Sequence, residues 1–148
     1  MTVDQPAPEH RRPDGVSDET VAALGKLSEA LEAVEDARGH LYGFHRLCGT
    51  ADLTLGEAVE LLRDAGHDDL AERVESELVG RNIVEGRWSF QLVEEYDDGY
   101  YASFRTVERL AREELVEGRR HLFEAEMKES RRTVGARHHE AAPDDLGS

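Results

Sequence analysis

The spacing of apolar residues predicts a long helix near the start of the chain. It follows Ser17, a residue type that favours helix N-caps, and Asp18 and Glu19 lie where the helix dipole favours anions. Its apolar positions form one stripe at helical spacing: Leu24, Leu27, Leu31, Val34, Leu41 and Cys48. Because glycines weaken its second half, we expect the helix to end near Cys48 or Gly49.

Two short helices are predicted next, over about residues 54–65 and 69–79. The run Thr54-Leu55-Gly56-Glu57 has the spacing of a capping box, in which two side chains satisfy the free N–H groups of the first turn. Each apolar face is followed by a glycine, a residue type that commonly ends helices, at Gly66 and Gly80.

The pattern then changes in residues 81–93, where apolar side chains alternate on either side of Glu85-Gly86, as in a small β-hairpin or an extended arm. A second long helix is predicted over about residues 94–133. Its stripe consists of Tyr96, Tyr100, Phe104, Val107, Ala111, Leu115, Gly118, Leu122 and Ala125. The fold class that follows is mostly α: a helical bundle of two long helices and a short helical pair, with one small β-hairpin.

The two ends of the chain differ from the rest in composition. Residues 1–16 hold three of the four prolines and almost no aliphatic side chains, and residues 135–148 are similar. We therefore expect disordered tails at 1–16 and 135–148 around a single helical domain at 17–134. The start lacks the apolar run of a secretory signal, and no window has the apolar length of a membrane span, so a cytoplasmic location is expected.

Charge narrows the classes of partner. The net charge is −15, with 33 acidic residues against 18 basic ones, so nucleic acid and membrane surfaces are not expected as partners. The order of elements at 54–93 matches a winged-helix DNA reader. However, the segment that would have to read DNA, residues 68–77, carries five acids and one arginine, which argues against DNA binding.

Polar residues interrupt both apolar stripes at a spacing of two helical turns. Arg38 and His45 lie within the first stripe, and Glu114 and His121 lie along one side of the second. If the stripes pack together, these four residues form an internal polar site. A buried arginine needs a carboxylate, and Glu114 is the best placed by pattern. The structural interpretation is an ion-pair layer that fixes the register of the helices; the functional one is an anion clamp with proton-carrying or metal-binding histidines.

A metal ion is the one cofactor that these side chains suggest. His45 and His121, with Glu114 or Glu117, have the ligand types of a mononuclear site. A di-iron centre is disfavoured because the Glu-x-x-His spacing is absent. Cys48 lies just beyond His45 on the stripe, but a single cysteine on an apolar face is more often a core residue.

Six of the nine aromatic residues fall within positions 88–104. Four of them are candidates for an aromatic pocket that would suit a cationic or planar ligand: Trp88, Phe90, Tyr96 and Tyr100. The alternative is that these rings simply form core.

No phosphate-binding, dinucleotide-binding or nucleophile-elbow motif occurs in the sequence. The leading hypothesis is therefore a non-catalytic cytoplasmic protein that acts as an interaction or accessory module and associates with itself as a homo-oligomer. The alternative is a helical bundle that binds a metal ion or a small molecule through Arg38, His45, Glu114 and His121. Whether such a bundle is an enzyme stays open at this point.

Overall fold

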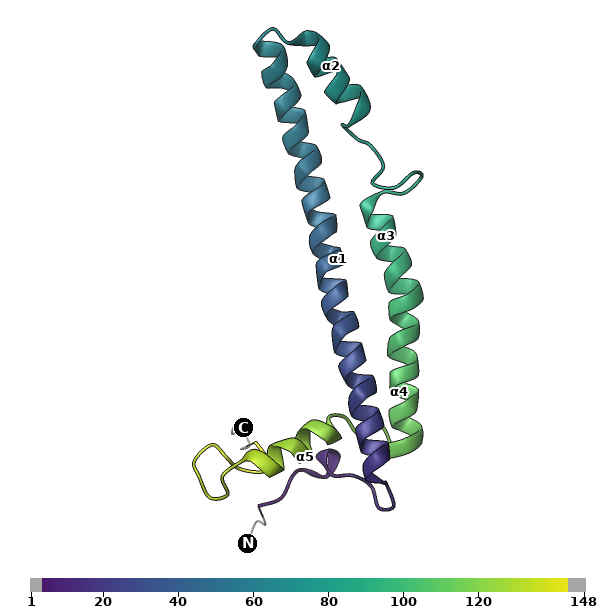
Figure 1. The fold of residues 1–148 in the computed structure, drawn as a ribbon, viewed down its shortest axis with the longest axis vertical. Helices are drawn as coiled ribbons and strands as arrows, with labels where there is room; N and C mark the ends of the chain where they lie inside the picture. The colour runs from purple at the N-terminus through teal and green to yellow at the C-terminus, as the bar shows by residue number, and fades with distance from the viewer. Residues whose placement is uncertain (1–3, 144–148) are drawn as a thin grey trace, which may run out of the picture. The chain divides into compact units, whose positions relative to one another are not determined.

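The computed structural model describes residues 4–143 and confirms a mostly α fold (Figure 1). The helices, in chain order, are η1 (Pro8–His10), α1 (Asp18–Asp64), α2 (Asp68–Glu77), α3 (Ser89–Tyr96), the π-helical turn η2 (Asp97–Tyr101), α4 (Ala102–Val116) and α5 (Leu122–Arg131). They divide into two compact units. Unit 1 contains the residues up to Ala33 and those from Phe104 onwards, and unit 2 is Val34–Ser103.

Helix α1 is a single helix of 47 residues, so the predicted end near Cys48 and the separate helix at 54–65 are both wrong. The glycines that suggested an end, Gly39, Gly43 and Gly49, are interior residues of the helix, and a Cβ added at any of them would have no neighbouring atom within 4 Å. Three glycines cost up to about 1 kcal/mol each, which a helix of this length tolerates. The helix ends before Gly66, whose φ of +85° favours glycine.

In unit 2, α2 folds back against the end of α1, and α3 runs beside α1 (Figure 1). Val59 of α1 and Ala71 of α2 are buried, and Arg63 forms an ion pair with Glu75. Helix α2 agrees with the predicted helix at 69–79, to within two residues at its end.

The described residues contain no β-strand, so the predicted hairpin at 81–93 is wrong. Around Glu85-Gly86 a single β-bridge joins Val84 to Arg87, and α3 begins at Ser89. The Trp88 backbone N–H donates to Gln91 Oε1 at 2.8 Å, which caps the new helix.

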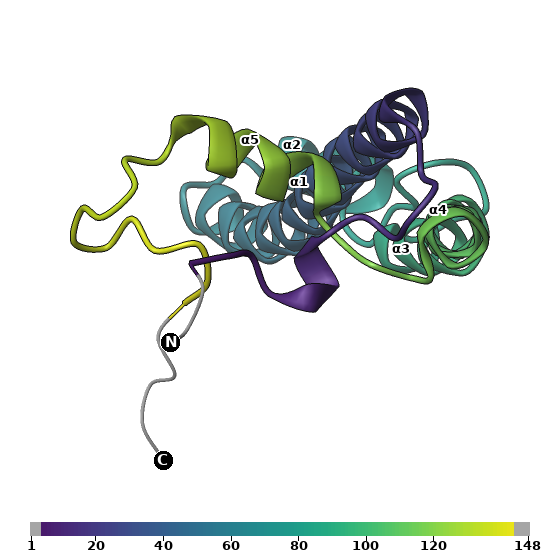
Figure 2. The same ribbon diagram turned by 90° about the horizontal axis from the view of Figure 1, so that it is seen from below.

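In unit 1, the first turns of α1 pack against α4 and α5. The core consists of Val21, Leu24, Val116 and Leu122. Figure 2 shows α5 lying across α1, and the two helices approach so closely that a Cβ on Gly25 would lie 2.8 Å from Phe123 Cγ.

The predicted second helix of 94–133 is wrong in its continuity. Three residues with positive φ, Glu117, Gly118 and His121, separate α4 from α5. The turn is closed by hydrogen bonds in both directions, from Gly118 N to Arg112 O at 2.9 Å and from Arg112 Nη1 to Gly118 O at 3.2 Å.

The segment before α1 makes defined contacts in unit 1. Arg12 forms ion pairs with Asp18 and Glu126, and the Asp4 carboxylate pairs with Arg132 and accepts a hydrogen bond from Ala141 N. Residues 1–3 and 144–148 of the predicted tails lie outside the described range, and the domain boundaries 17–134 stay a prediction.

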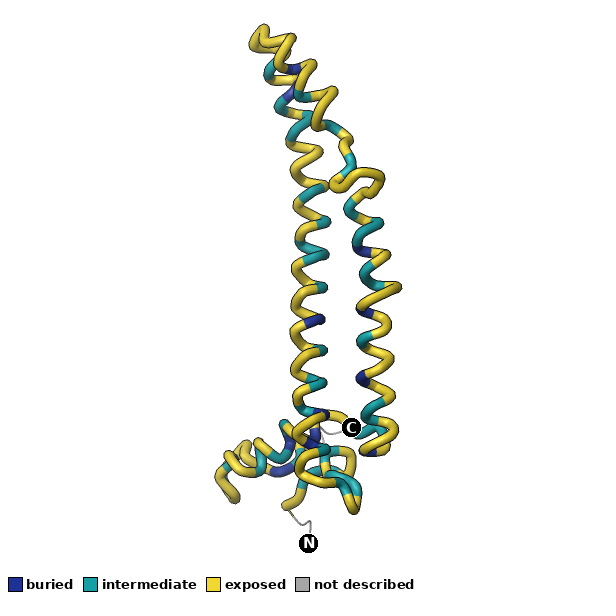
Figure 3. Tube along the Cα trace, turned by 45° about the vertical axis from the view of Figure 1, so that its right-hand side comes forward, coloured by how far each residue is buried: buried dark blue, intermediate teal, exposed yellow. Residues whose placement is uncertain are grey.

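Burial is one-sided along α1. In Figure 3 its buried and half-buried positions follow one side of the helix, and long stretches of the other side are exposed. Among residues 4–143, no helix combines the length and apolarity needed to cross a membrane.

Candidate functional site

A polar network in unit 2 joins α1 to the π-helical turn. The Arg38 guanidinium binds the Asp97 carboxylate through two bonds, Nε to Oδ1 at 2.8 Å and Nη2 to Oδ2 at 3.2 Å. The Tyr42 hydroxyl donates to Asp97 Oδ2 at 2.6 Å. A bidentate pair of this kind fixes direction as well as distance. The prediction that Glu114 would pair with Arg38 is therefore wrong, because Asp97 supplies the carboxylate.

Aromatic rings enclose the Arg38 guanidinium. Its central carbon lies 4.8 Å from the Tyr42 ring centroid and 4.6 Å from that of Tyr101. The Tyr101 hydroxyl donates to both oxygens of Glu35, at 2.8 and 2.9 Å. The cation is thus held between two rings, each of which also bonds a carboxylate.

The network shifts the pKa values of its members in the directions that stabilise the ion pair. Hydrogen bonds from Arg38 and Tyr42 lower the pKa of Asp97 below its usual value, and the Asp97 carboxylate raises the pKa of Arg38. The hydrogen bond that the Tyr42 hydroxyl donates to Asp97 also raises the pKa of that hydroxyl. Each charge therefore already has its partner within the chain.

The π turn is what brings these groups together. Tyr96 and Tyr101 are five residues apart and both turn towards α1: Tyr101 is buried, and the Tyr96 hydroxyl donates to Val34 O at 3.4 Å. Their rings stack with centroids 6.2 Å apart. In an α-helix the residue after Tyr96 on that face would be Tyr100, which is instead 60% exposed.

The other residues of the predicted polar site have separate surroundings. In unit 2, His45 Nδ1 lies 2.8 Å from Ser89 Oγ, a bond that ties α1 to the first residue of α3. In unit 1, Glu114 and Glu117 are exposed, and His121 precedes α5 with Nδ1 3.9 Å from Glu124 Oε2.

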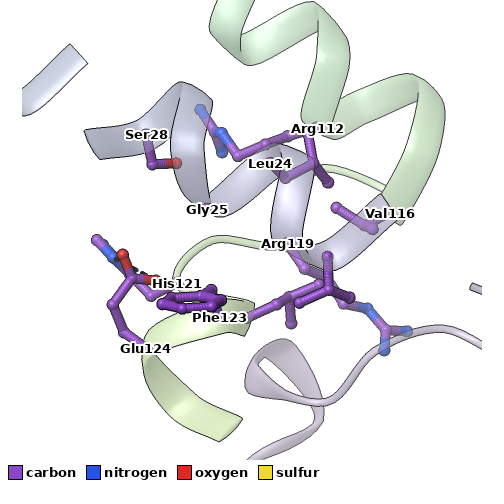
Figure 4. A pocket seen from close by; sticks show the side chains of 11 residues that line it. Leu24, Gly25, Ser28, Arg112, Val116, Arg119, His121, Phe123 and Glu124 are labelled. Carbon is purple, nitrogen blue, oxygen red and sulfur yellow. Dashed lines mark ion pairs between the residues drawn. The ribbon is translucent and has the colours of Figure 1, made fainter. Parts of the chain in front are cut away.

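His121 also lines a cleft of about 10 Å³ between α1, α4 and α5, too small for an organic ligand (Figure 4). Beside it, the buried Glu108 carboxylate accepts from Arg112 Nε at 2.7 Å and Ser28 Oγ at 3.4 Å. This pair is satisfied internally and joins α4 to α1. The small cavity and the closed ion pair indicate a structural role.

No three His, Cys, Asp or Glu side chains within residues 4–143 gather closely enough to hold a metal ion. The metal ligands suggested by the sequence, His45, His121 and Glu117, lie in different units, His45 in unit 2 and the others in unit 1. The metal site therefore stays a prediction, and no cluster of ligand side chains in the described residues supports it.

The four candidate pocket aromatics divide into two pairs. Tyr96 and Tyr100 belong to the rings around the π turn, with centroids 5.8 Å apart. Trp88 and Phe90 instead line a hollow of about 600 Å³ that faces α1. Trp88 is 42% exposed and Phe90 is 49% exposed, so neither side chain is buried in a core.

A seam on α1, mostly apolar and mostly exposed, was missed from the sequence. Its members alternate at spacings of three and four residues, which is the heptad pattern of a coiled coil: Ala37, His40, Phe44, Leu47, Ala51, Thr54, Ala58 and Leu61. Phe44 is 43% exposed, Leu47 70% and Leu61 68%. The signal was hidden because a helix ending at Cys48 cuts the seam in half; reading α1 as continuous reveals it.

The positions beside the seam carry few charges. On one flank lie Cys48, Leu55 and Leu62, and on the other lie Gly43, Thr50, Glu57 and Asp64. From residue 43 to residue 56 neither flank bears a charge, although the whole chain has a net charge of −15. Such local depletion of charge is typical of a surface that another apolar surface covers.

Comparison with known proteins identifies no relative: no family model matches the chain, and no curated protein or solved structure matches it.

Proposed function

We propose that this protein is a non-catalytic cytoplasmic interaction module that associates with itself through the exposed seam of α1. The observation that carries the proposal is the heptad spacing of Phe44, Leu47, Ala51, Thr54, Ala58 and Leu61 on an exposed helix face. Side chains at this spacing insert between those of a second helix with the same spacing. A second copy of the chain supplies such a helix.

Unit 2 gives a physical reason for the association. Its buried apolar residues are few: Val34, Val59, Ala71, Val93 and Tyr101. A helix pair covers only one side of each helix, whereas packing against a second pair covers both. Covering Leu47 and Leu61 removes from water two of the most exposed large apolar side chains of α1.

The polar network supports a structural role better than a catalytic one. Arg38 binds Asp97 and Tyr42, and His45 bonds Ser89, so these groups hold α1 against the segment 89–101. The alternative function, ligand binding by Arg38, His45, Glu114 and His121, would require Arg38 to give up a bidentate partner.

The test is sedimentation velocity over a wide concentration range, with Leu47→Gln compared with Leu53→Gln. Both leucines are on α1 and both are highly exposed, 70% and 75%, but Leu53 lies off the seam. Burying a leucine contributes about 1.5–3 kcal/mol, and a dimer buries Leu47 twice. Leu47→Gln should therefore weaken the dimer by on the order of 100-fold or more, and Leu53→Gln should leave it unchanged.

A wild-type protein that stays monomeric up to about 100 µM refutes self-association, because a dimer more stable than about 5.5 kcal/mol would form at that concentration. Equal behaviour of the two variants would show that any dimer uses another surface.

A further inference from the structure

The hollow beside Trp88 has the size of a ligand site. Its volume of about 600 Å³ falls within the range of small-molecule pockets, about 300–1,000 Å³. One wall is α1, with Cys48, Asp52 and Leu55, and the other is the segment after α2, with Ile83, Trp88 and Phe90. All of these residues belong to unit 2.

Hydrogen bonds join the two walls at both ends of the hollow and fix their separation. Asp52 Oδ1 accepts from Gly80 N at 2.7 Å at one end of the hollow. His45 Nδ1 and Ser89 Oγ lie 2.8 Å apart at the other end. Because both ends of the 80–89 segment are tied to α1, the segment arches over the hollow rather than collapsing into it. A space framed in this way is largely formed before anything enters it.

The walls favour an apolar ligand with a flat ring system. Ile83, Trp88 and Phe90 are 40%, 42% and 49% exposed, so large apolar surfaces remain in contact with water. Aromatic side chains gain most from covering such surfaces by stacking against another ring. Ser89 and Asn82 add neutral polar groups to the same lining.

Charge selects among such ligands. Unit 2 contains sixteen acidic residues against six arginines and no lysine. Asp52 and Arg81 both line the hollow, but the Arg81 guanidinium donates to the Glu77 carbonyl at 3.4 Å. A field of this sign concentrates cations and repels anions, and a cation over the Trp88 ring adds a favourable contact.

We propose that the hollow between α1 and residues 80–90 binds a planar organic cation. The hollow adjoins the seam used for self-association, because Ala51 belongs to both, but its binding of a ligand does not rest on that proposal. The ring system of the ligand lies against Trp88 and Phe90, and its positive charge lies near Asp52.

Trp88 is the only tryptophan of the chain, so its fluorescence reports on this hollow alone. We would titrate the full-length protein with berberine, a planar cation whose absorption overlaps tryptophan emission, and with the anionic dye 1-anilinonaphthalene-8-sulfonate. The expected result is saturable 1:1 quenching by berberine. Asp52→Asn keeps the oxygen that accepts from Gly80, so it should weaken berberine by about five- to tenfold and leave the anionic dye unaffected or bound more tightly.

Cys48→Phe tests the location, because a ring at this position occupies the hollow. It should abolish berberine quenching, and the matched Leu53→Phe variant, exposed on the same helix outside the lining and off the seam, should retain it. Circular dichroism shows whether each variant folds. Since Cys48 is the only cysteine, alkylating it with N-ethylmaleimide in the folded wild type gives a second block that needs no refolding.

Three results overturn the proposal: no saturable quenching at millimolar berberine, equal quenching in the Cys48→Phe and Leu53→Phe variants, or an Asp52→Asn variant that binds berberine as tightly as the wild type. A berberine affinity that falls as the dimer forms would show that a second copy fills the hollow instead. The Leu47→Gln variant separates the two proposals, because it should lose self-association and keep berberine quenching.

Discussion

Replacing Gly25 or Gly39 by alanine makes the same chemical change in the same helix, and we expect opposite effects on stability. In a helix interior, alanine is favoured over glycine by about 1 kcal/mol. Gly39 has no atom within 4 Å of an added Cβ, so Gly39→Ala should stabilise the protein by most of that amount. A Cβ on Gly25 would lie 2.8 Å from Phe123 Cγ and 2.9 Å from Phe123 Cβ.

The clash at Gly25 cannot be relieved by rotating a side chain alone. Phe123 Cβ is bonded to the α5 backbone, so α5 must shift away from α1 and disturb the core formed with Leu24 and Leu122. Overpacking of this kind costs about 1–3 kcal/mol, of which the helical gain offsets about 1 kcal/mol. Gly25→Ala should therefore be less stable than the wild type by about 1 kcal/mol, and less stable than Gly39→Ala by about 2 kcal/mol.

Thermal unfolding followed by circular dichroism at one protein concentration measures the difference, which for a chain of this size corresponds to about 4–8 °C in Tm. Urea titration gives the free energies separately. If Gly25→Ala unfolds at or above the temperature of Gly39→Ala, the packing of α5 on α1 described here is wrong.

Three further predictions concern the core, the ion pair and self-association. Val116→Ala removes two carbons from a side chain that is 1% exposed, so it should cost about 2 kcal/mol in urea unfolding, while Val107→Ala, at a position 60% exposed, should cost less than about 0.5 kcal/mol. The pKa of Asp97 is lowered in the folded state, so its stabilisation is present above its unfolded value of 3.8 and is lost as the pH falls through the lower folded value. The stability gap between wild type and Asp97→Asn should therefore be largest near neutral pH and close in acid, and a gap that persists at the lowest pH would contradict the ion-pair account. Because each copy carries a net charge of −15, the dimer should tighten as NaCl is raised from low to physiological concentration, and sedimentation showing the reverse would indicate that ion pairs hold it together.

Apolar periodicity predicted the fold class and the stop at Gly66, because both depend on local chemistry. It failed at the glycines of α1, since whether a glycine ends a helix depends on what surrounds it, and nothing crowds Gly39 or Gly49. The alternating Trp88, Phe90 and Leu92 resembled a strand, but Gln91 caps a helix that starts at Ser89. At both places the local sequence is compatible with two conformations, and tertiary packing determines which one forms.

The candidate site was predictable in part. Arg38 was correctly expected to need a carboxylate, but Asp97 was not found because it lies outside a stripe drawn at regular α-helical spacing. The π turn shifts that spacing by one residue, which places Tyr101 rather than Tyr100 against α1. No simple sequence pattern signals a π turn. Its position can be recognised only from the contacts that it permits, such as Arg38 with Asp97 and Tyr101 with Glu35.

The π turn also marks the place where this helix tolerates a change in chain length. In the regular turns of α1 or α4, deleting one residue rotates everything after it by about 100° relative to what precedes it. Deleting Gly99 would instead leave Tyr101 four residues after Tyr96, so an α-helical turn would keep both rings on the face that meets α1. A lineage of such proteins can therefore lose one residue between Tyr96 and Ala102 and still keep the two flanking segments aligned.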